Sequence, residues 1–134
     1  MPLIDDNSIA NDDLLLRRVH RSQWIYDDNL GRSRPTSQAF DTIEMSVDVA
    51  RIHTAAGRPI LSALGAMPDF ALTSFQAGLP RAHNLAVCPD PEPANDAHAV
   101  VFGKKGKPFI KEAYRTCVWV HSPDNVDPNW RQPA

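Results

Sequence analysis

The sequence has only two cysteines and six glycines, and it contains no apolar run long enough to cross a bilayer. Two cysteines are too few for a disulfide scaffold, and a membrane-spanning helix needs about 20 apolar residues. The first residues, MPLIDDNSIANDD, have neither the basic region nor the apolar region of a secretory signal. We therefore expect a cytoplasmic protein with reduced thiols and no contact with a membrane.

The sequence also lacks a large charge of one sign, because its formal net charge is −2. A value so close to zero gives the whole molecule no attraction to nucleic acid or anionic lipid. Trp24 and Tyr26 follow the arginines of residues 17–21, and such a set can stack on bases. Tryptophans in a small protein more often fill or cover its core. Nucleic acid is therefore a possible partner that the sequence does not favour.

Common chemical fingerprints are missing as well. The chain has no GxSxG, HExxH or GxGxxG motif, so no hydrolase elbow, metalloprotease helix or dinucleotide loop is indicated. Two cysteines and two histidines could in principle hold zinc, but they include no CxxC pair and both cysteines lie in apolar runs. We expect neither a metal nor a cofactor. The four residues of that set are Cys88, His98, Cys117 and His121.

Proline is abundant, with 12 residues in a chain of 134. A chain of this length fits one domain, and prolines favour short elements joined by rigid turns. Residues 1–12 are acidic and show no periodicity, which predicts a flexible N-terminal arm. Residues 122–134 contain three prolines and predict a C-terminal tail, unless Trp130 docks it onto the body. The folded domain is expected to span residues 13–121.

Hydrophobic patterns inside that span alternate between strand and helix. The clearest strand is 44–52, where Met45, Val47 and Val49 alternate with polar or small residues. We expect a short helix at 58–67, another helix beginning at 107, and loops at 27–35 and 89–96. Residues 117–121 fit either the end of that helix or a strand. The other expected strands are 13–20, 69–75, 84–88 and 97–103.

This order of elements predicts the fold class. Strands interleaved with a few helices, without a regular βαβ repeat, are typical of α+β proteins. We expect a single compact α+β domain with a mixed or antiparallel sheet of about five strands and two or three helices.

The lysines form the most unusual cluster of charge. All four lysines lie within residues 104–111, whereas ten arginines are scattered along the chain. Pro108 is a good first residue of a helix, so Lys104, Lys105 and Lys107 are placed at a helix N-terminus, where positive charge is disfavoured. Helix N–H groups and ammonium groups together can bind an anion. The alternative is a solvated loop tip, and it is the commoner use of such a sequence.

Arg17, Ser46 and His98 are the candidate catalytic residues. An arginine on a central strand is costly to bury unless it meets a carboxylate or an anionic ligand, although edge strands often carry arginines as protection. His98 alternates with apolar residues on its strand, so it is either a hydrogen-bonded core residue or a general base. The order of an early arginine and a later strand serine resembles ADP-ribosyltransferase-like folds. Neither Glu44 nor Glu112 matches the catalytic glutamate that such a resemblance implies.

The order LLRRVH, RPTSQAF, MSVDVA and PDPEPANDAHAVVFGKK also resembles small bacterial proteins of unknown activity. The resemblance covers most of residues 14–120 and implies no catalytic assignment. It implies that Ser37, Phe40, Ser46 and His98 belong to one framework.

Two functions remain open at this point. The first is a small bacterial accessory or binding protein that docks on a protein partner and binds a phosphate-containing anion through its lysine loop. The alternative is a small nucleotide- or nucleic-acid-directed enzyme or toxin-like domain, in which Arg17, Ser46 and His98 must converge on one pocket. The first needs an exposed apolar patch instead.

Overall fold

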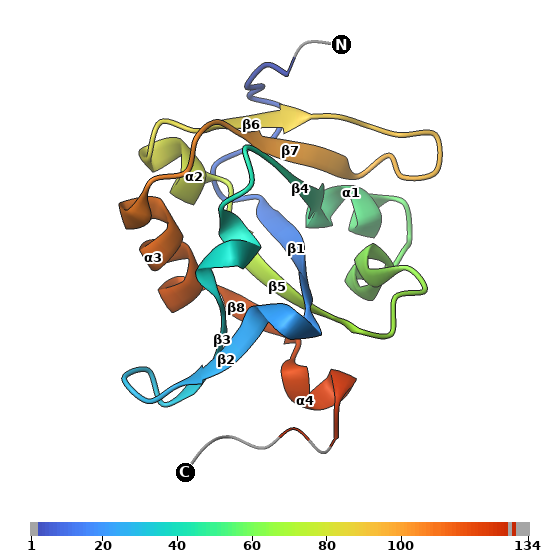
Figure 1. Cartoon of the computed structure of the whole chain (residues 1–134). Helices are drawn as coiled ribbons and strands as arrows, with labels where there is room; N and C mark the ends of the chain where they lie inside the picture. The colour runs from blue at the N-terminus through green and yellow to red at the C-terminus, as the bar shows by residue number, and fades with distance from the viewer. Residues whose placement is uncertain (1–2, 129, 131–134) are drawn as a thin grey trace.

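The computed structural model describes residues 3–128 and 130. They form one α+β domain around a six-stranded antiparallel sheet (Figure 1), with strand order β6-β7-β4-β1-β5-β8. The central strands are the longest, and each edge strand has four residues, which leaves few unpaired backbone groups at the edges. The six strands are β1 (Leu14–His20), β4 (Glu44–Val49), β5 (Phe70–Gln76), β6 (Ala86–Pro89), β7 (His98–Phe102) and β8 (Val118–His121).

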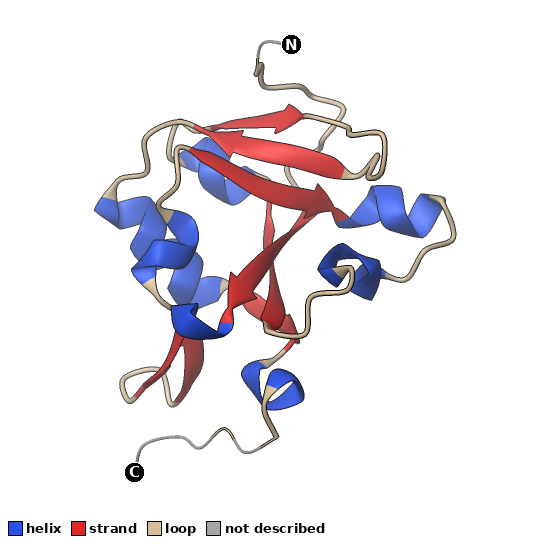
Figure 2. Cartoon of the chain, turned by 45° about the vertical axis from the view of Figure 1, so that its right-hand side comes forward, coloured by secondary structure: helices blue, strands red, loops and turns tan. Residues whose placement is uncertain are grey.

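The remaining elements are short and cover both faces of the sheet. Strands β2 (Trp24–Asp27) and β3 (Arg32–Pro35) pair in a separate hairpin. Figure 2 shows helices on both sides of the twisted sheet. The helices are α1 (Ala50–Ala55), α2 (Gly78–Ala82), α3 (Lys107–Thr116) and α4 (Pro123–Val126), with 3₁₀ turns η1 (Arg21–Gln23), η2 (Ser37–Phe40) and η3 (Ile60–Leu64).

The two faces of the sheet carry cores of unequal size. The larger core lies under α3 and η2, where Phe40 and Phe109 are fully buried against the strands. The smaller core lies under α1 and η3 and is built around Leu16, Ala63 and Leu72. Alternation along a strand sends neighbouring side chains to opposite faces, so each residue of β1 and β4 is assigned to one core or the other.

The fold class and most of the strands are confirmed. Met45, Val47 and Val49 are all buried on the larger-core face, as their alternation predicts. The protein has more strands than expected, because residues 118–121 add β8 to the sheet and β2 and β3 pair in a separate hairpin. The loop predicted at 27–35 is therefore wrong for residues 32–35, which form β3. Helix α3 ends at Thr116, so Cys117 caps the helix and His121 lies on a strand.

Two elements differ from the sequence prediction. The strand predicted to run to residue 52 ends at Val49, and α1 begins directly at Ala50. Alanine and arginine in ARIHTA are good helix formers, and this local preference takes over once the strand leaves the sheet. The helix predicted at 58–67 is the 3₁₀ turn η3, which ends before Gly65 with its positive φ of 58°.

The arm predicted at the N-terminus packs on the body over the residues described. Ile9 is 2% exposed and belongs to the larger core. Arg81 holds the segment by donating to the carboxylate of Asp5 and to the backbone oxygens of Asp6 and Ile9. The segment also runs beside edge strand β6, where Asp6 N–H donates to the Val87 oxygen. The expectation of a flexible arm is therefore corrected for residues 3–12, because one apolar side chain and one arginine anchor it.

Trp130 docks the C-terminal segment onto the domain, which is the alternative to a free tail that the sequence analysis left open. Its indole N–H donates to the Ser33 hydroxyl at 3.1 Å, and its ring meets Trp24 edge to face. The preceding residues form α4, so the part of the tail that is described continues the folded domain. Residues 129 and 131–134 of the predicted tail lie outside the described residues.

Candidate functional site

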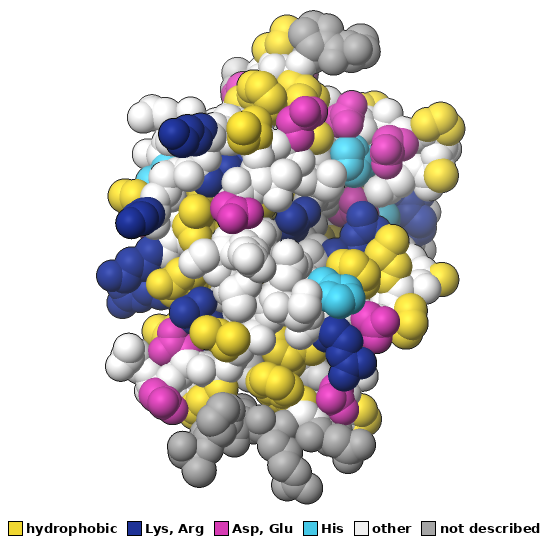
Figure 3. All heavy atoms as spheres, viewed as in Figure 1, with side chains coloured by type: hydrophobic (Ala, Val, Ile, Leu, Met, Phe, Trp, Pro, Cys, Tyr) yellow, Lys and Arg dark blue, Asp and Glu magenta, His cyan; other side chains and the backbone are white. Residues whose placement is uncertain are grey.

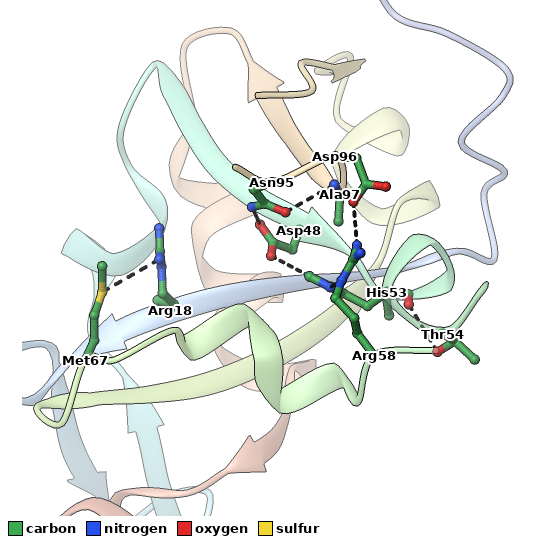
Figure 4. A network of polar contacts seen from close by, with 10 residues as sticks. Arg18, Asp48, His53, Thr54, Arg58, Met67, Asn95, Asp96 and Ala97 are labelled. Atoms are coloured by element: carbon green, nitrogen blue, oxygen red, sulfur yellow. Dashed lines mark hydrogen bonds and ion pairs between the residues drawn. The ribbon is translucent and has the colours of Figure 1, made fainter. Parts of the chain in front are cut away.

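A polar cavity of about 280 Å³ opens on the smaller-core face, between β1, β4, α1, η3 and the loop at 89–96. Charged side chains approach it from three separate parts of the sequence, and Figure 4 shows them as sticks. We call it the arginine cavity. The lining residues used below are Arg18, Asp48, His53, Arg58, Ser62 and Asn95.

The local sequence explains how three of these side chains meet. Asp48 is near the end of β4, on the face that it shares with its cross-strand partners Leu16 and His98. Because α1 begins two residues later, His53 lies on the first turns of the helix and its ring returns to Asp48. Arg58 follows the helix, where Arg58 N–H donates to the His53 backbone oxygen. Spacings of five residues thus bring Asp48, His53 and Arg58 together.

The carboxylate of Asp48 is buried but fully paired. Its Oδ2 lies 2.7 Å from His53 Nε2, and its Oδ1 accepts from Asn95 Nδ2 at 3.0 Å. Asp48 is 8% exposed and His53 is 3% exposed. Burying a charge without partners costs several kcal/mol, so these two hydrogen bonds are what allow a carboxylate at this position.

Arg58 completes the network and fixes the tautomer of His53. The Arg58 Nε–H donates to His53 Nδ1 at 3.0 Å, and Arg58 Nη2 pairs with Asp96. An N–H that points at Nδ1 requires a lone pair there, so the ring proton lies on Nε2 and is donated to Asp48. Both ring nitrogens are therefore occupied. His53 cannot activate a serine in this arrangement, and its role is to hold Arg58 in place.

Arg18 lines the same cavity from β1 but is held much more loosely. Its hydrogen bond in the structure is a weak one, from Nη1 to the Met67 sulfur at 3.7 Å. Among the described residues, Arg18 makes no ion pair with a carboxylate. A guanidinium has five N–H donors, so most donors of Arg18 have no protein partner among the described residues.

Ser46 lies beside this cavity. It lines a small hollow together with Arg18, Asp48 and Ala63, and these three residues also line the arginine cavity. Arg18, Ser46, Asp48 and His98 therefore all lie on the same face of the sheet.

Arg17, by contrast, lies on the opposite face of the sheet. Its guanidinium donates to the backbone oxygens of Ala39 and Ser46, at 3.0 and 2.9 Å. Burial, with Arg18 nearby, lowers the pKa of Arg17 to about 10. The sequence argument required a carboxylate or a ligand for an inward arginine, but two backbone carbonyls satisfy this one.

His98 has a structural role in the β7 region. Its Nδ1 lies 2.9 Å from the Asp90 backbone oxygen and 3.2 Å from the Asp90 carboxylate, which ties β7 to the end of β6. Arg17 therefore lies on the other face of the sheet from Ser46 and His98. The structure thus does not bring the three candidate catalytic residues into one site.

The lysine loop divides into one buried and two exposed residues. Lys105 is 7% exposed, and its ammonium donates to the backbone oxygens of Ile43, Val101 and Gly103 at 2.6–2.8 Å. Burial, with a smaller contribution from Arg17, lowers the pKa of Lys105 to about 8. All three N–H donors are occupied, so Lys105 is not open to a ligand. Lys104 and Lys107 are exposed, and anion binding by these two stays a prediction.

The cysteines show no sign of reactivity or of a metal site. Cys88 and Cys117 are free and buried, and burial raises the pKa of both thiols. Within residues 3–128 and 130, no group of three or more His, Cys, Asp and Glu residues is arranged to hold a metal ion.

A larger hollow of about 530 Å³ lies where β5, α2 and α3 meet. Its walls are mainly apolar and include Leu14, Leu79 and Val118, and Glu112 lies at its rim with its carboxylate paired to His83. It offers little chemistry compared with the arginine cavity.

Sequence reasoning missed the Asp48–His53–Arg58 network. Asp48 lies in the strand predicted at 44–52, Arg58 begins the helix predicted at 58–67, and His53 lies between them. None of the three lies in a known motif. Their five-residue spacing was visible, but it becomes a site only when the chain changes from strand to helix at Ala50.

Comparisons of the chain with models of protein families, with curated proteins and with solved structures find no match. In the part of the chain that is described, none of the helices has the length and apolar character needed to cross a membrane. Function must therefore be argued from the geometry of the site.

Proposed function

We propose that this protein binds a small phosphate-containing anion in the arginine cavity, between Arg18 and Arg58. The observation that carries the proposal is that two arginines line one cavity: Arg58 is held by His53 and Asp96, and Arg18 has no carboxylate partner among the described residues. Arginine is the residue best suited to phosphate because its planar fork donates two parallel hydrogen bonds.

The charge of the cavity supports an anion in this position. Asp48 is the acidic residue of the lining, and both of its oxygens already accept hydrogen bonds from Asn95 and His53. Among the described residues, Arg58 Nη1 has no hydrogen-bond partner and Arg18 donates only to a thioether. An anion that bridges the two guanidiniums would replace a weak contact with charge-assisted hydrogen bonds.

The size of the cavity favours a phosphorylated small molecule over a bare ion. Its volume of about 280 Å³ is at the lower end of the range of ligand pockets. Ser62 and Asn95 line the same space and add polar groups beside the guanidiniums. A ligand of this kind fits the binding protein expected from the sequence, with the anion site at the arginines instead of at Lys105.

The enzyme alternative gains no support from the geometry. Arg17 donates to backbone carbonyls on the far face of the sheet, and both nitrogens of His53 are occupied. Docking on a protein partner and location in the cytoplasm stay predictions of the binding-protein function.

The test is a calorimetric titration of the purified chain with inorganic phosphate and phenyl phosphate. Binding to the wild type and a loss of about tenfold or more in affinity for Arg18→Gln are expected, because a hydrogen bond to a charged group contributes about 1.5–3 kcal/mol. Arg21→Gln is the matched control, since Arg21 is exposed and paired with Asp69 and Asp127 at another place on the surface.

Two results would overturn the proposal. One is wild-type binding that Arg18→Gln leaves unchanged. The other is binding of acetate as tight as that of phosphate, which would identify a carboxylate site.

A further inference from the structure

The exposed cations of α3 form a second basic region, on the other side of the sheet from the arginine cavity. Lys107, Lys111 and Arg115 recur every four residues, which places them along one face of the helix. Lys104 lies in the loop that precedes the helix, and all four side chains are exposed. Figure 3 shows Lys and Arg side chains gathered on the side of the molecule that α3 occupies in Figure 1. We call Lys104, Lys107, Lys111 and Arg115 the basic face of α3.

The basic face differs from the rest of the surface because its cations lack partners. Ion pairs hold five arginines elsewhere, each with its own aspartate. In the described part of the chain, none of the four cations of the basic face makes an ion pair. The paired arginines are Arg21, Arg34, Arg51, Arg58 and Arg81.

Two acidic side chains lie close to the basic face, and each has a hydrogen-bond partner outside it. Glu112 lies on the same helix and lines one hollow with Lys111 and Arg115, and its carboxylate lies 2.8 Å from His83 Nε2. Asp27 lies across a hollow from Lys111 and is paired with Arg34 at 2.6 Å. The net charge of −2 therefore does not describe this face.

The shape of this surface suits an extended polyanion. Two hollows of about 400 and 280 Å³ flank the helix, and Lys111 and Arg115 line both of them. Their apolar lining is limited to Leu30 and Pro108, together with Tyr114, whose ring is covered by Arg34 at 3.7 Å. Protein interfaces normally have a cluster of aromatic or aliphatic anchors at their centre, whereas the apolar part of these hollows is only Leu30, Pro108 and the covered ring of Tyr114.

We propose that the basic face of α3 binds the phosphate backbone of nucleic acid. A row of unpaired cations about 6 Å apart along a helix, without an apolar centre, matches contacts that position a protein on phosphates. It offers no pattern for reading bases, so the binding is independent of sequence. The surface lies apart from the arginine cavity, and the proposal does not rest on the proposed function.

The test is fluorescence anisotropy with a labelled DNA duplex of about 20 base pairs and a labelled single-stranded RNA, at increasing salt. For the duplex, neutralisation of three phosphates predicts a log–log salt slope of about −2.7, which is about a 40-fold loss of affinity between 50 and 200 mM salt. The variant Lys107→Gln/Lys111→Gln/Arg115→Gln is expected to lose binding at least tenfold.

A matched variant, Lys107→Arg/Lys111→Arg/Arg115→Lys, keeps the charges and is expected to bind like the wild type. Circular dichroism of both variants checks that α3 is intact. The proposal is overturned if the wild type does not bind either nucleic acid at 50 mM salt, or if the neutral variant binds equally well. Tighter binding of poly-L-glutamate than of either nucleic acid would also overturn it and would identify an acidic protein as the partner.

Discussion

The arginine cavity and the basic face of α3 use positive charge in opposite ways. In the cavity, Arg58 is fixed by His53 and Asp96, and a buried carboxylate lies behind it. On α3, the cations stand in solvent without ion-pair partners in the described residues. A fixed guanidinium loses little freedom when a ligand binds, which suits one small anion. Mobile ammonium groups suit a long polyanion, where many weak contacts add up.

The largest predicted effect comes from breaking the buried network behind the cavity. Asp48→Ala leaves His53 Nε2–H and the Asn95 amide without acceptors, so the free energy of unfolding should fall by about 3 kcal/mol. Urea denaturation measures the loss. Asp96→Ala removes the exposed end of the same network and should cost less than about 1 kcal/mol. Equal losses for the two variants would show that Asp48 is not a buried support.

Lys105 is predicted to behave as a core residue although it lies within the lysine loop. Lys105→Met leaves three backbone carbonyls without their shared donor, and we expect a loss of about 2 kcal/mol in the free energy of unfolding. Lys104→Met is the control, because Lys104 is exposed and should change stability by less than about 0.5 kcal/mol. A negligible loss for Lys105→Met would contradict the structural role.

The stability of the wild type should also depend on pH through Lys105. Its pKa in the folded protein is about 8, below the ordinary value of 10.5, so the unfolded chain binds the proton more tightly. Between these two values the wild type should gain stability relative to Lys105→Met as pH rises, by on the order of 1 kcal/mol per pH unit. Below pH 8 the difference should be constant. Urea denaturation of both proteins from pH 7 to 10 checks the sign, and a falling difference would be contrary to it.

The smallest predicted effect is on the stability of the basic face itself. The neutral variant at positions 107, 111 and 115 removes no ion pair, so its free energy of unfolding should stay within about 0.5 kcal/mol of the wild type. Thermal unfolding gives the comparison. A loss of 2 kcal/mol or more would mean that these cations support the fold, which would weaken the contrast with the arginine cavity.

Sequence patterns predicted the sheet better than the site. Met45, Val47 and Val49 revealed a strand because burial on one face imposes a period of two. The arginine cavity depends instead on long-range placement: Arg18 comes from β1, and Asn95 from a loop 77 positions later in the chain. The lysine cluster was visible, yet no local signal separated buried Lys105 from exposed Lys104 and Lys107.

The same limit explains the termini. Ile9 and Trp130 each stand among polar neighbours, so neither belongs to a periodic apolar pattern. Each is nevertheless enough to dock its segment, Ile9 in the larger core and Trp130 against Ser33 and Trp24.

The most direct test of the central claim is a phosphate titration of isotope-labelled protein followed by amide and arginine side-chain NMR. The phosphate concentration should be raised to about 10 mM, so that binding with a dissociation constant of about 1 mM would approach saturation. We predict saturable shifts of the Arg18 and Arg58 Nε–H signals and of amides at 62–65 and 94–97, with residues 107–115 unaffected at the same concentrations. Shifts confined to α3, or no saturable shift around the cavity, would contradict the assignment of the anion site to Arg18 and Arg58.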